Sequence, residues 1–296
     1  MTYNNLRILL FGNVYQNRKN KYVEAILKKL QDLRIDTYIE EDFAQYIKSE
    51  LGIKTDYCHT FNSSVIIPAN AAISVGGDGT FLGTAAQIGS SDIPILGINT
   101  GRLGFLADVS PDTIDASIEA LCAGDYIIEE RKALAVMKNG KLSTSHPYAL
   151  NEVAVLKHDN SSLIEIETRI DGHFLTNYLA DGLIVSTPTG STAYSLSVGG
   201  PILEPQSCTI CLSPVAPHSL SVRPVVVHDS VSIHMNIHSR SGNFLLSCDG
   251  HSESLPDTTT LDIRCAPHTI KVIKIKHKHF FDTLREKMMW GADPRN

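Results

Sequence analysis

The sequence lacks the features of a membrane or secreted protein. None of its apolar runs approaches the ~18–20 residues that a helix needs to span a bilayer. The start of the chain, Met1 to Asn5, has neither the basic region nor the apolar region of a secretory signal. The net charge of −6 disfavours non-specific binding to nucleic acid or to an anionic membrane. We therefore expect a cytoplasmic protein without nucleic-acid or membrane partners.

Familiar metal, thiol and nucleotide motifs are missing too. The six cysteines are scattered; Cys208 and Cys211 form one C-x-x-C pair without a second, and the histidines show no ligand grouping, so no protein-held metal is predicted. A Walker P-loop is excluded because G-x-x-x-x-G-K-[ST] does not occur. The spacing of Gly77, Gly79 and Gly83 does not match the dinucleotide fingerprint G-x-G-x-x-G. Neither G-x-S-x-G nor H-E-x-x-H is present.

What the sequence does contain is a glycine-rich loop, Gly76-Gly77-Asp78-Gly79-Thr80. It follows the apolar run 72–75, which has the character of a buried strand, and precedes a helix expected to begin near Phe81. Glycines let the backbone approach a ligand closely and adopt angles closed to other residues. A strand, loop and helix in this order point N–H groups outward, which suits phosphate. The carboxylate of Asp78 would repel phosphate, so it indicates phosphoryl chemistry in which the acid positions a hydroxyl or a metal. A plain glycine turn in which Asp78 caps the next helix is the alternative.

The first 128 residues alternate between strand and helix patterns, which predicts an α/β domain with a parallel sheet covered on both faces. The expected strands are 6–11, 35–39, 72–75 and 93–98. The expected helices are about 23–33, 81–88 and 110–121, the last with proline in its first turn. Residues 41–71 are compatible with a helix and an irregular crossover.

From residue 129 the pattern changes to short alternating stretches separated by turn residues, which predicts a mainly β, sandwich-like domain over 129–276. Asn139-Gly140 and Asp171-Gly172 are hairpin signals. Residues 280–290 return to helical character, so we expect 277–296 to complete the first domain. The expected strands are 133–137, 152–157, 163–170, 182–186, 225–227, 231–237, 243–247, 259–264 and 270–276.

Three more segments suit a polar ligand. A second glycine loop, 99–106, follows a second parallel strand and contains Phe105, a ring that stacks on a base or lies in the core. Asn151-Glu152 can hold a ribose diol or a base edge, although such a pair is often structural. The stretch 181–201 is crowded with hydroxyl side chains, and its Tyr194 offers a flat face for a base.

These motifs, in this order and with this spacing, resemble the bacterial NAD kinase family, whose fold is related to diacylglycerol kinases. The resemblance covers about residues 72–291 and includes Cys248-Asp249-Gly250 and Trp290-Gly291. It implies transfer of a phosphoryl group from ATP to the adenosine-ribose 2′-hydroxyl of NAD, giving NADP. Some members of the family also accept inorganic polyphosphate. A divalent cation, normally Mg²⁺, is implied, and it needs few protein ligands because it keeps several waters.

The resemblance also implies roles for individual residues. Asp78 faces the reacting hydroxyl and accepts its proton late, because phosphoryl transfer depends more on positioning than on early deprotonation. The donor phosphates are held by loop N–H groups of Gly76, Gly77, Gly79 and Thr80. The residues implied in NAD binding are Asp78, Gly79, Phe105, Asn151, Glu152, Asp181, Thr192, Ala193, Tyr194, Ser197 and Asp249; Asp181 and Asp249 are assigned to the nicotinamide half.

Two other classes remain open at this level, a lipid or sugar kinase that shares the GGDG loop, and a non-catalytic dinucleotide sensor. The Asn151-Glu152 pair and the hydroxyl-rich stretch are not expected in the first class, and loss of Asp78 would mark the second. The family resemblance further implies a homotetramer or homodimer built through the β-rich domain, and substrate held in a crevice that the two domains share.

Overall fold

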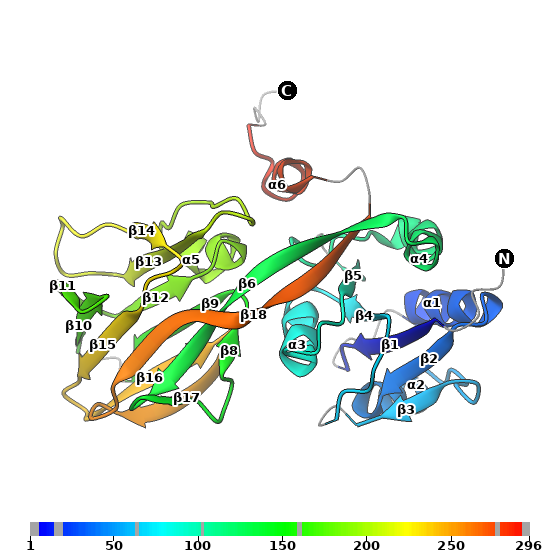
Figure 1. Ribbon diagram of the computed structural model, residues 1–296, viewed down its shortest axis with the longest axis horizontal. Helices are drawn as coiled ribbons and strands as arrows, with labels where there is room; N and C mark the ends of the chain where they lie inside the picture. The colour runs from blue at the N-terminus through cyan, green and yellow to red at the C-terminus, as the bar shows by residue number, and fades with distance from the viewer. Residues whose placement is uncertain are drawn as a thin grey trace. The chain divides into compact units, whose positions relative to one another are not determined.

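The computed structural model describes residues 6–14, 20–62, 65–101, 104–158, 162–275 and 279–291. The chain divides into two compact units (Figure 1). Unit 1 contains residues 1–130 and 270–296, and unit 2 contains residues 131–269. No described helix combines the length and the apolar character that crossing a membrane requires.

Unit 1 is built on a parallel sheet in the order β5-β4-β1-β2-β3. Its strands are β1 (Arg7–Gly12), β2 (Asp36–Glu40), β3 (His59–Phe61), β4 (Ala71–Gly76) and β5 (Ile95–Asn99). In register, Ile8 of β1 lies beside Ala71 of β4, and Ala72 of β4 lies beside Ile95 of β5. The chain order reverses between β4 and β1, and ligands bind open α/β sheets at the carboxyl ends of the strands at such a point.

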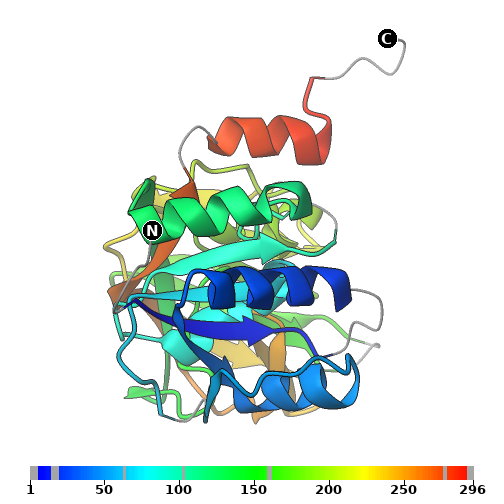
Figure 2. The same cartoon turned by 90° about the vertical axis from the view of Figure 1, so that its right-hand side faces the viewer.

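Helices cover both faces of this sheet because its strands are apolar on both sides. Helices α1, α2 and α4 lie on one face and α3 on the other (Figures 1 and 2). The first face has a core in which Ile8, Leu10 and Ile73 of the sheet pack with Ile26 and Ile118 of the helices. The helices are α1 (Asn20–Asp32), α2 (Glu41–Ser49), α3 (Asp78–Ile88), α4 (Ile114–Ala123) preceded by a 3₁₀ turn (Pro111–Thr113), and α6 (Phe280–Met288).

Unit 2 is a β-sandwich with antiparallel pairing in both layers. One layer has the order β14-β13-β12-β9-β16-β17, and the other contains β11, β10, β15 and the first part of β18, with β6 pairing β7, β8 and β18. Side chains from both layers, such as Val155 and Ile166, share one apolar core. The strands are β6 (Tyr126–Lys138), β7 (Lys141–Leu142), β8 (Tyr148–Ala149), β9 (Glu152–Lys157), β10 (Ile164–Ile170), β11 (His173–Ala180), β12 (Gly182–Ser186), β13 (Thr209–Val215), β14 (Val225–His228), β15 (Ile233–His238), β16 (Asn243–Cys248), β17 (His251–Pro256) and β18 (Leu261–Ile275); α5 (Tyr194–Ser197) follows a 3₁₀ turn (Thr189–Thr192).

Three hairpins in unit 2 turn on a pair of residues with positive φ, the geometry of type I′ turns. Asn139-Gly140 joins β6 to β7, and Asp171-Gly172 joins β10 to β11, as the sequence predicted. Asp249-Gly250 joins β16 to β17 in the same way, with φ of 48° and 86°. This third turn was not predicted from the sequence, in which Asp249-Gly250 was named only as part of a motif that resembles the family.

The α/β and mainly β architecture is confirmed, whereas several predicted boundaries are wrong. The stretches expected at 259–264 and 270–276 belong to one strand, β18, which runs on from unit 2 into unit 1. Strands β3, β7, β11, β13 and β17 were not predicted, because they are short or because polar and proline residues interrupt their alternation. Residue 276 lies outside the described residues.

Candidate active site

The glycine loop joins β4 to α3, but its glycines act differently from the prediction. Helix α3 begins at Asp78 rather than near Phe81, with Gly77 as its N-cap. None of Gly76, Gly77 and Gly79 has a positive φ. Their backbone angles are therefore open to other residues and do not explain why glycine is present. A Cβ on Gly76 would lie 2.1 Å from Oγ1 of Thr80, whereas a Cβ on Gly77 or Gly79 would meet open space. Gly76 is required by packing, and the other two keep the start of α3 uncovered.

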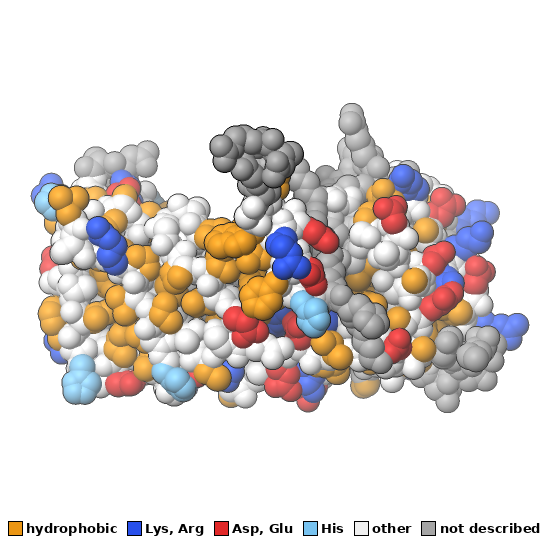
Figure 3. Space-filling view, turned by 90° about the horizontal axis from the view of Figure 1, so that it is seen from above, with side chains coloured by type: hydrophobic (Ala, Val, Ile, Leu, Met, Phe, Trp, Pro, Cys, Tyr) orange, Lys and Arg blue, Asp and Glu red, His pale blue; other side chains and the backbone are white. Residues whose placement is uncertain are grey.

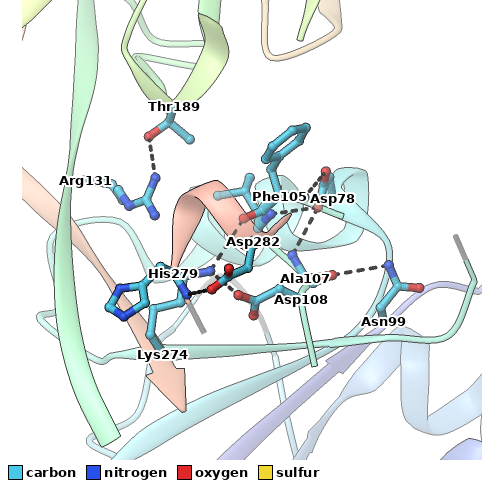
Figure 4. Close-up of polar contacts among 11 residues, drawn as sticks. Asp78, Asn99, Phe105, Ala107, Asp108, Arg131, Thr189, Lys274, His279 and Asp282 are labelled. Carbon is cyan, nitrogen blue, oxygen red and sulfur yellow. Dashed lines mark hydrogen bonds and ion pairs between the residues drawn. The ribbon is translucent and has the colours of Figure 1, made fainter. Parts of the chain in front are cut away.

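The carboxylate of Asp78 is held by four donors, and Figure 4 shows those from the loop of Phe105 and Ala107. Its Oδ2 accepts the backbone N–H of Phe105 at 2.9 Å, and its Oδ1 accepts those of Leu106 and Ala107 at 3.0 Å each. The ammonium group of Lys287 in α6 donates to Oδ2 at 3.2 Å. Burial raises the pKa of Asp78, but Lys287 and the three N–H groups outweigh it, so the pKa lies below its usual value. Asp78 is therefore an ionised, fixed carboxylate at neutral pH.

The loop that contacts Asp78 is fixed from several sides (Figure 4). Gly104 packs so closely that a Cβ would lie 2.0 Å from Oδ1 of Asp78. Asn99, at the end of β5, donates from Nδ2 to the carbonyl of Ala107 at 3.2 Å. Lys274 of β18 forms a buried ion pair with Asp108 at 2.6 Å. The predicted loop residues 102 and 103 lie outside the described residues.

A cavity of about 250 Å³ opens beside the glycine loop, between the carboxyl ends of β1 and β2 and the first turns of α3. Most of the residues that line it are small or polar, and those from α3 include two glycines and two threonines. The residues that line it are Phe11, Gly12, Asn13, Val14, Glu40, Gly79, Thr80, Gly83, Thr84 and Gln87. The cavity lies at the reversal of strand order and adjoins the uncovered start of α3.

In unit 2 a second carboxylate fixes a second loop. Asp249 accepts the consecutive backbone N–H groups of Leu150 (2.6 Å), Asn151 (2.8 Å) and Glu152 (3.1 Å). Burial raises the pKa of Asp249, and these three N–H groups oppose the rise only in part. The structure thus brings Asn151, Glu152 and Asp249 together.

The side chains of Asn151 and Glu152 carry buried oxygens that no described group satisfies. Oδ1 of Asn151 and Oε2 of Glu152 have no hydrogen-bond partner, and neither does Oγ of Ser186, which is paired with Glu152 across β12 and β9. Such atoms are costly to bury unpaired, and a ligand with hydroxyl or amine donors would satisfy them. Burial, together with the charge of Asp249, raises the pKa of Glu152 to about 7, and the N–H of Tyr194 offsets this slightly.

The hydroxyl-rich segment packs directly on this pair. Thr187 donates from its N–H to the carbonyl of Asn151 and from Oγ1 to that of Leu150, at 2.9 and 2.6 Å. A Cβ on Gly190 would lie 2.1 Å from the Asn151 carbonyl, so only glycine fits there. The segment continues into α5, where the side chain of Tyr194 is 38% exposed and Ser197 is exposed. Thr192 and Ala193 lie just before α5, half-buried.

Asp181 is the exception among the predicted residues of unit 2. It precedes β12, whereas Ser186 and its partner Glu152 lie at the other end of that strand. Its carboxylate forms an ion pair with Lys157 at 2.7 Å. Within unit 2 the structure does not bring Asp181 to Asn151 and Glu152.

Sequence reasoning missed Asn99, Asp108, Ser186, Lys274 and Lys287. Asn99 had a usable signal, since it ends a parallel strand beside β4. Lys274 and Lys287 had none, because their partners are more than a hundred residues away in the sequence. Over the described ranges, no three His, Cys, Asp or Glu side chains group as metal ligands.

Comparisons with known proteins agree with this architecture. Residues 8–126 match the model of the ATP-NAD kinase N-terminal domain, and residues 150–275 match that of the ATP-NAD kinase C-terminal domain. An NAD kinase of Bacteroides fragilis is 50% identical over 290 residues, covering 98% of this chain and 100% of the relative. An NAD kinase of Porphyromonas gingivalis is 42% identical over 291 residues, covering 98% and 99%.

Two solved structures share the fold at low sequence identity. A yeast NADH kinase complexed with NADH superposes with a TM-score of 0.86 at 23% identity, covering 97% of this chain and 89% of that one. An NAD kinase from Archaeoglobus fulgidus in complex with ATP superposes with a TM-score of 0.75 at 24% identity, covering 97% and 100%.

Proposed function

Since the chain belongs to the ATP-NAD kinase family, we propose that it phosphorylates the adenosine-ribose 2′-hydroxyl of NAD with ATP as donor. The hydroxyl oxygen forms a bond to the γ-phosphorus, and the bond from that phosphorus to the β,γ-bridging oxygen breaks. ADP leaves with the electron pair, and the hydroxyl proton passes to a carboxylate or water. The observation that carries the proposal is a fixed carboxylate, Asp78, on the first residue of a helix whose start is uncovered.

Asp78 orients the hydroxyl in this proposal and takes its proton late. Its lowered pKa makes it a weak base, which suits a loose transition state in which positioning matters more than deprotonation. The outward N–H groups of Gly77, Gly79 and Thr80 receive phosphate groups, because the first N–H groups of a helix have no intrahelical partner. The cavity beside the loop is of a size for a nucleoside, and we assign it to the donor.

In unit 2, Asn151 and Glu152 hold the adenosine end of NAD. Their unpartnered oxygens accept hydroxyl or amine donors, and ribose and adenine offer both. Tyr194 supplies a ring for the base, with Thr192, Ala193 and Ser197 beside it in sequence. Phe105 of unit 1 keeps its proposed place in NAD binding, and so does Asp181 toward the nicotinamide half. Asp249, which was predicted there as well, accepts the N–H groups of Asn151 and Glu152 and so supports the adenosine end.

A divalent cation, with Mg²⁺ the expected ion, accompanies ATP in this proposal and neutralises phosphate charge. Mg²⁺ usually keeps several waters and takes few protein ligands, so we expect phosphates and water to hold it. A cytoplasmic location and a homotetramer or homodimer remain predictions; light scattering at micromolar concentration tests the assembly.

The test of the function is an assay of the purified protein with NAD, ATP and Mg²⁺, in which a coupled dehydrogenase detects NADP. We expect NADP only when both ATP and the divalent metal are present. Diacylglycerol and fructose 6-phosphate are tested as alternative acceptors with the same ATP and Mg²⁺, and release of ADP measures their turnover. Turnover of either one without turnover of NAD would overturn the proposal, and tight NAD binding without any product would favour a dinucleotide sensor instead.

A further inference from the structure

The acceptor positions of the Asp78 carboxylate are all occupied. A carboxylate offers about four lone-pair positions, and Asp78 receives four donors. Three are consecutive N–H groups of its neighbouring loop. The fourth is the ammonium group of Lys287, which comes from α6, 209 residues further along the chain. A substrate hydroxyl can donate to Asp78 only after one of these four has left.

The three backbone donors are not free to leave. Their loop is fastened to β5 through Asn99 and to β18 through the buried ion pair of Lys274 and Asp108. Gly104 is in contact with Asp78 itself. Releasing one of these N–H groups would require the loop to refold.

Lys287 is held far less firmly. Its Nζ lies 3.2 Å from Asp78 and 4.5 Å from the centre of the Phe105 ring, and its side chain is 32% exposed. Within α6 only Thr283 and Leu284 are buried, and Phe281 is 57% exposed. Hydrophobic side chains are exposed on the face seen in Figure 3. Met289 and Trp290, which follow α6, are exposed as well. A flexible lysine stem on a lightly packed helix is the donor that can move.

Where the ammonium group would go follows from its surroundings. It lies beside the start of α3, where the proposed phosphate groups meet outward N–H groups. Phosphate is the stronger attraction for a lysine cation, because it carries more charge and more acceptor oxygens than one carboxylate. A short movement of Nζ therefore exchanges one anion for another and vacates one position on Asp78.

We propose that Lys287 is a phosphate-binding residue of this kinase, which leaves the fourth acceptor position of Asp78 to the substrate hydroxyl when its ammonium group pairs with substrate phosphate. The proposal rests on the kinase activity proposed above. It assigns α6 a part in the reaction that its position near the end of the sequence does not suggest.

The experiment compares Lys287→Ala, Lys287→Gln and Lys287→Arg with wild type in the NAD, ATP and Mg²⁺ assay. We expect the Ala and Gln variants to lose about 10- to 100-fold in kcat/KM for ATP, the range for a hydrogen bond to a charged group. Lys287→Arg keeps a cation and should retain most of the activity. Added ethylammonium should restore part of the activity of Lys287→Ala, whereas tetramethylammonium at equal ionic strength should not.

The control variant is Arg285→Ala, on the same helix, whose guanidinium pairs with Asp282 rather than with Asp78. It should keep wild-type kinetics, and melting curves check the fold of every variant. Unchanged or higher kcat/KM in Lys287→Ala would overturn the proposal, and so would a loss that neither arginine nor ethylammonium recovers. A wild-type protein that makes no NADP would instead refute the kinase function, so the two failures are distinguishable.

Discussion

Glu152→Gln should make the protein more stable at alkaline pH and weaken its binding of NAD. The pKa of Glu152 rises from 4.5 to about 7, so folding disfavours the charged form. The folded state binds the proton more tightly than the unfolded state, and stability therefore falls as pH rises from about 4.5 to 7. Above pH 7 the ionised carboxylate costs up to about 3 kcal/mol, because one pKa unit corresponds to about 1.4 kcal/mol.

Glutamine has nearly the same shape and carries no charge, so the variant should recover part of this cost. A gain of about 1–2 kcal/mol corresponds to roughly 2–8 °C in melting temperature for a unit of this size. The gain should shrink at pH 5, where Glu152 is already protonated in the folded protein. Melting curves of both proteins at pH 5 and pH 8 measure the difference.

The same change should reduce NAD affinity, since an amide accepts a ribose hydroxyl less strongly than a carboxylate does. A hydrogen bond to a charged group contributes about 1.5–3 kcal/mol, which predicts a Kd about 10- to 100-fold higher by calorimetry at pH 8. Wild-type affinity should itself decline as pH falls below 7. Glu165→Gln, at an exposed hydrogen bond to Asn177, is the control and should change neither quantity. Equal stability of variant and wild type at pH 8, with equal NAD affinity, would refute the reasoning.

Four other substitutions test the remaining residues. Gly79→Ala should preserve or raise the melting temperature, because alanine stabilises a helix by up to about 1 kcal/mol relative to glycine. It should reduce activity, because its methyl group fills the space for phosphate. Gly76→Ala should lower the melting temperature, because its Cβ would lie 2.1 Å from Thr80. A lower melting temperature for Gly79→Ala together with an unchanged or higher one for Gly76→Ala would contradict this. Asp78→Asn should lower kcat by about 10²–10⁴-fold with NAD still bound, and near-normal kcat would remove its proposed role. Tyr194→Ala should raise the Kd for NAD by removing a stacking face of roughly 1–3 kcal/mol, and unaltered calorimetry would count against it.

The sequence predicted the fold best where the pattern of side chains is locally determined. Strands β9 and β12 were predicted with their exact bounds, because a turn residue flanks each apolar run. Helix α1 followed from its spacing of apolar residues. The prediction was wrong for β18, where charged and proline residues such as Arg264 and Pro267 suggest a break, although the strand continues through them and pairs with β15, β6 and β5.

For the candidate site, the sequence indicated which residue types matter but not what they contact. The loop acid Asp78 and the pair Asn151-Glu152 stood out because of their neighbours in the chain. The ion pair of Asp78 with Lys287 could not be predicted, because it depends on where α6 packs. The raised pKa of Glu152 also depends on tertiary structure, since burial and the charge of Asp249 cause it.

Asp78 and Asp249 have the same structural role, one in each unit. Each carboxylate accepts three consecutive backbone N–H groups from a loop that lies far away in the sequence. An unpaired N–H group in a buried loop is costly, and one carboxylate with several acceptor positions satisfies three of them at once. An asparagine at either position would turn an amide N–H group toward a backbone N–H group and leave both unsatisfied. The acid in each glycine-containing motif is therefore needed to shape its loop before any chemistry begins, which is why an acid persists at the centre of a loop suited to phosphate.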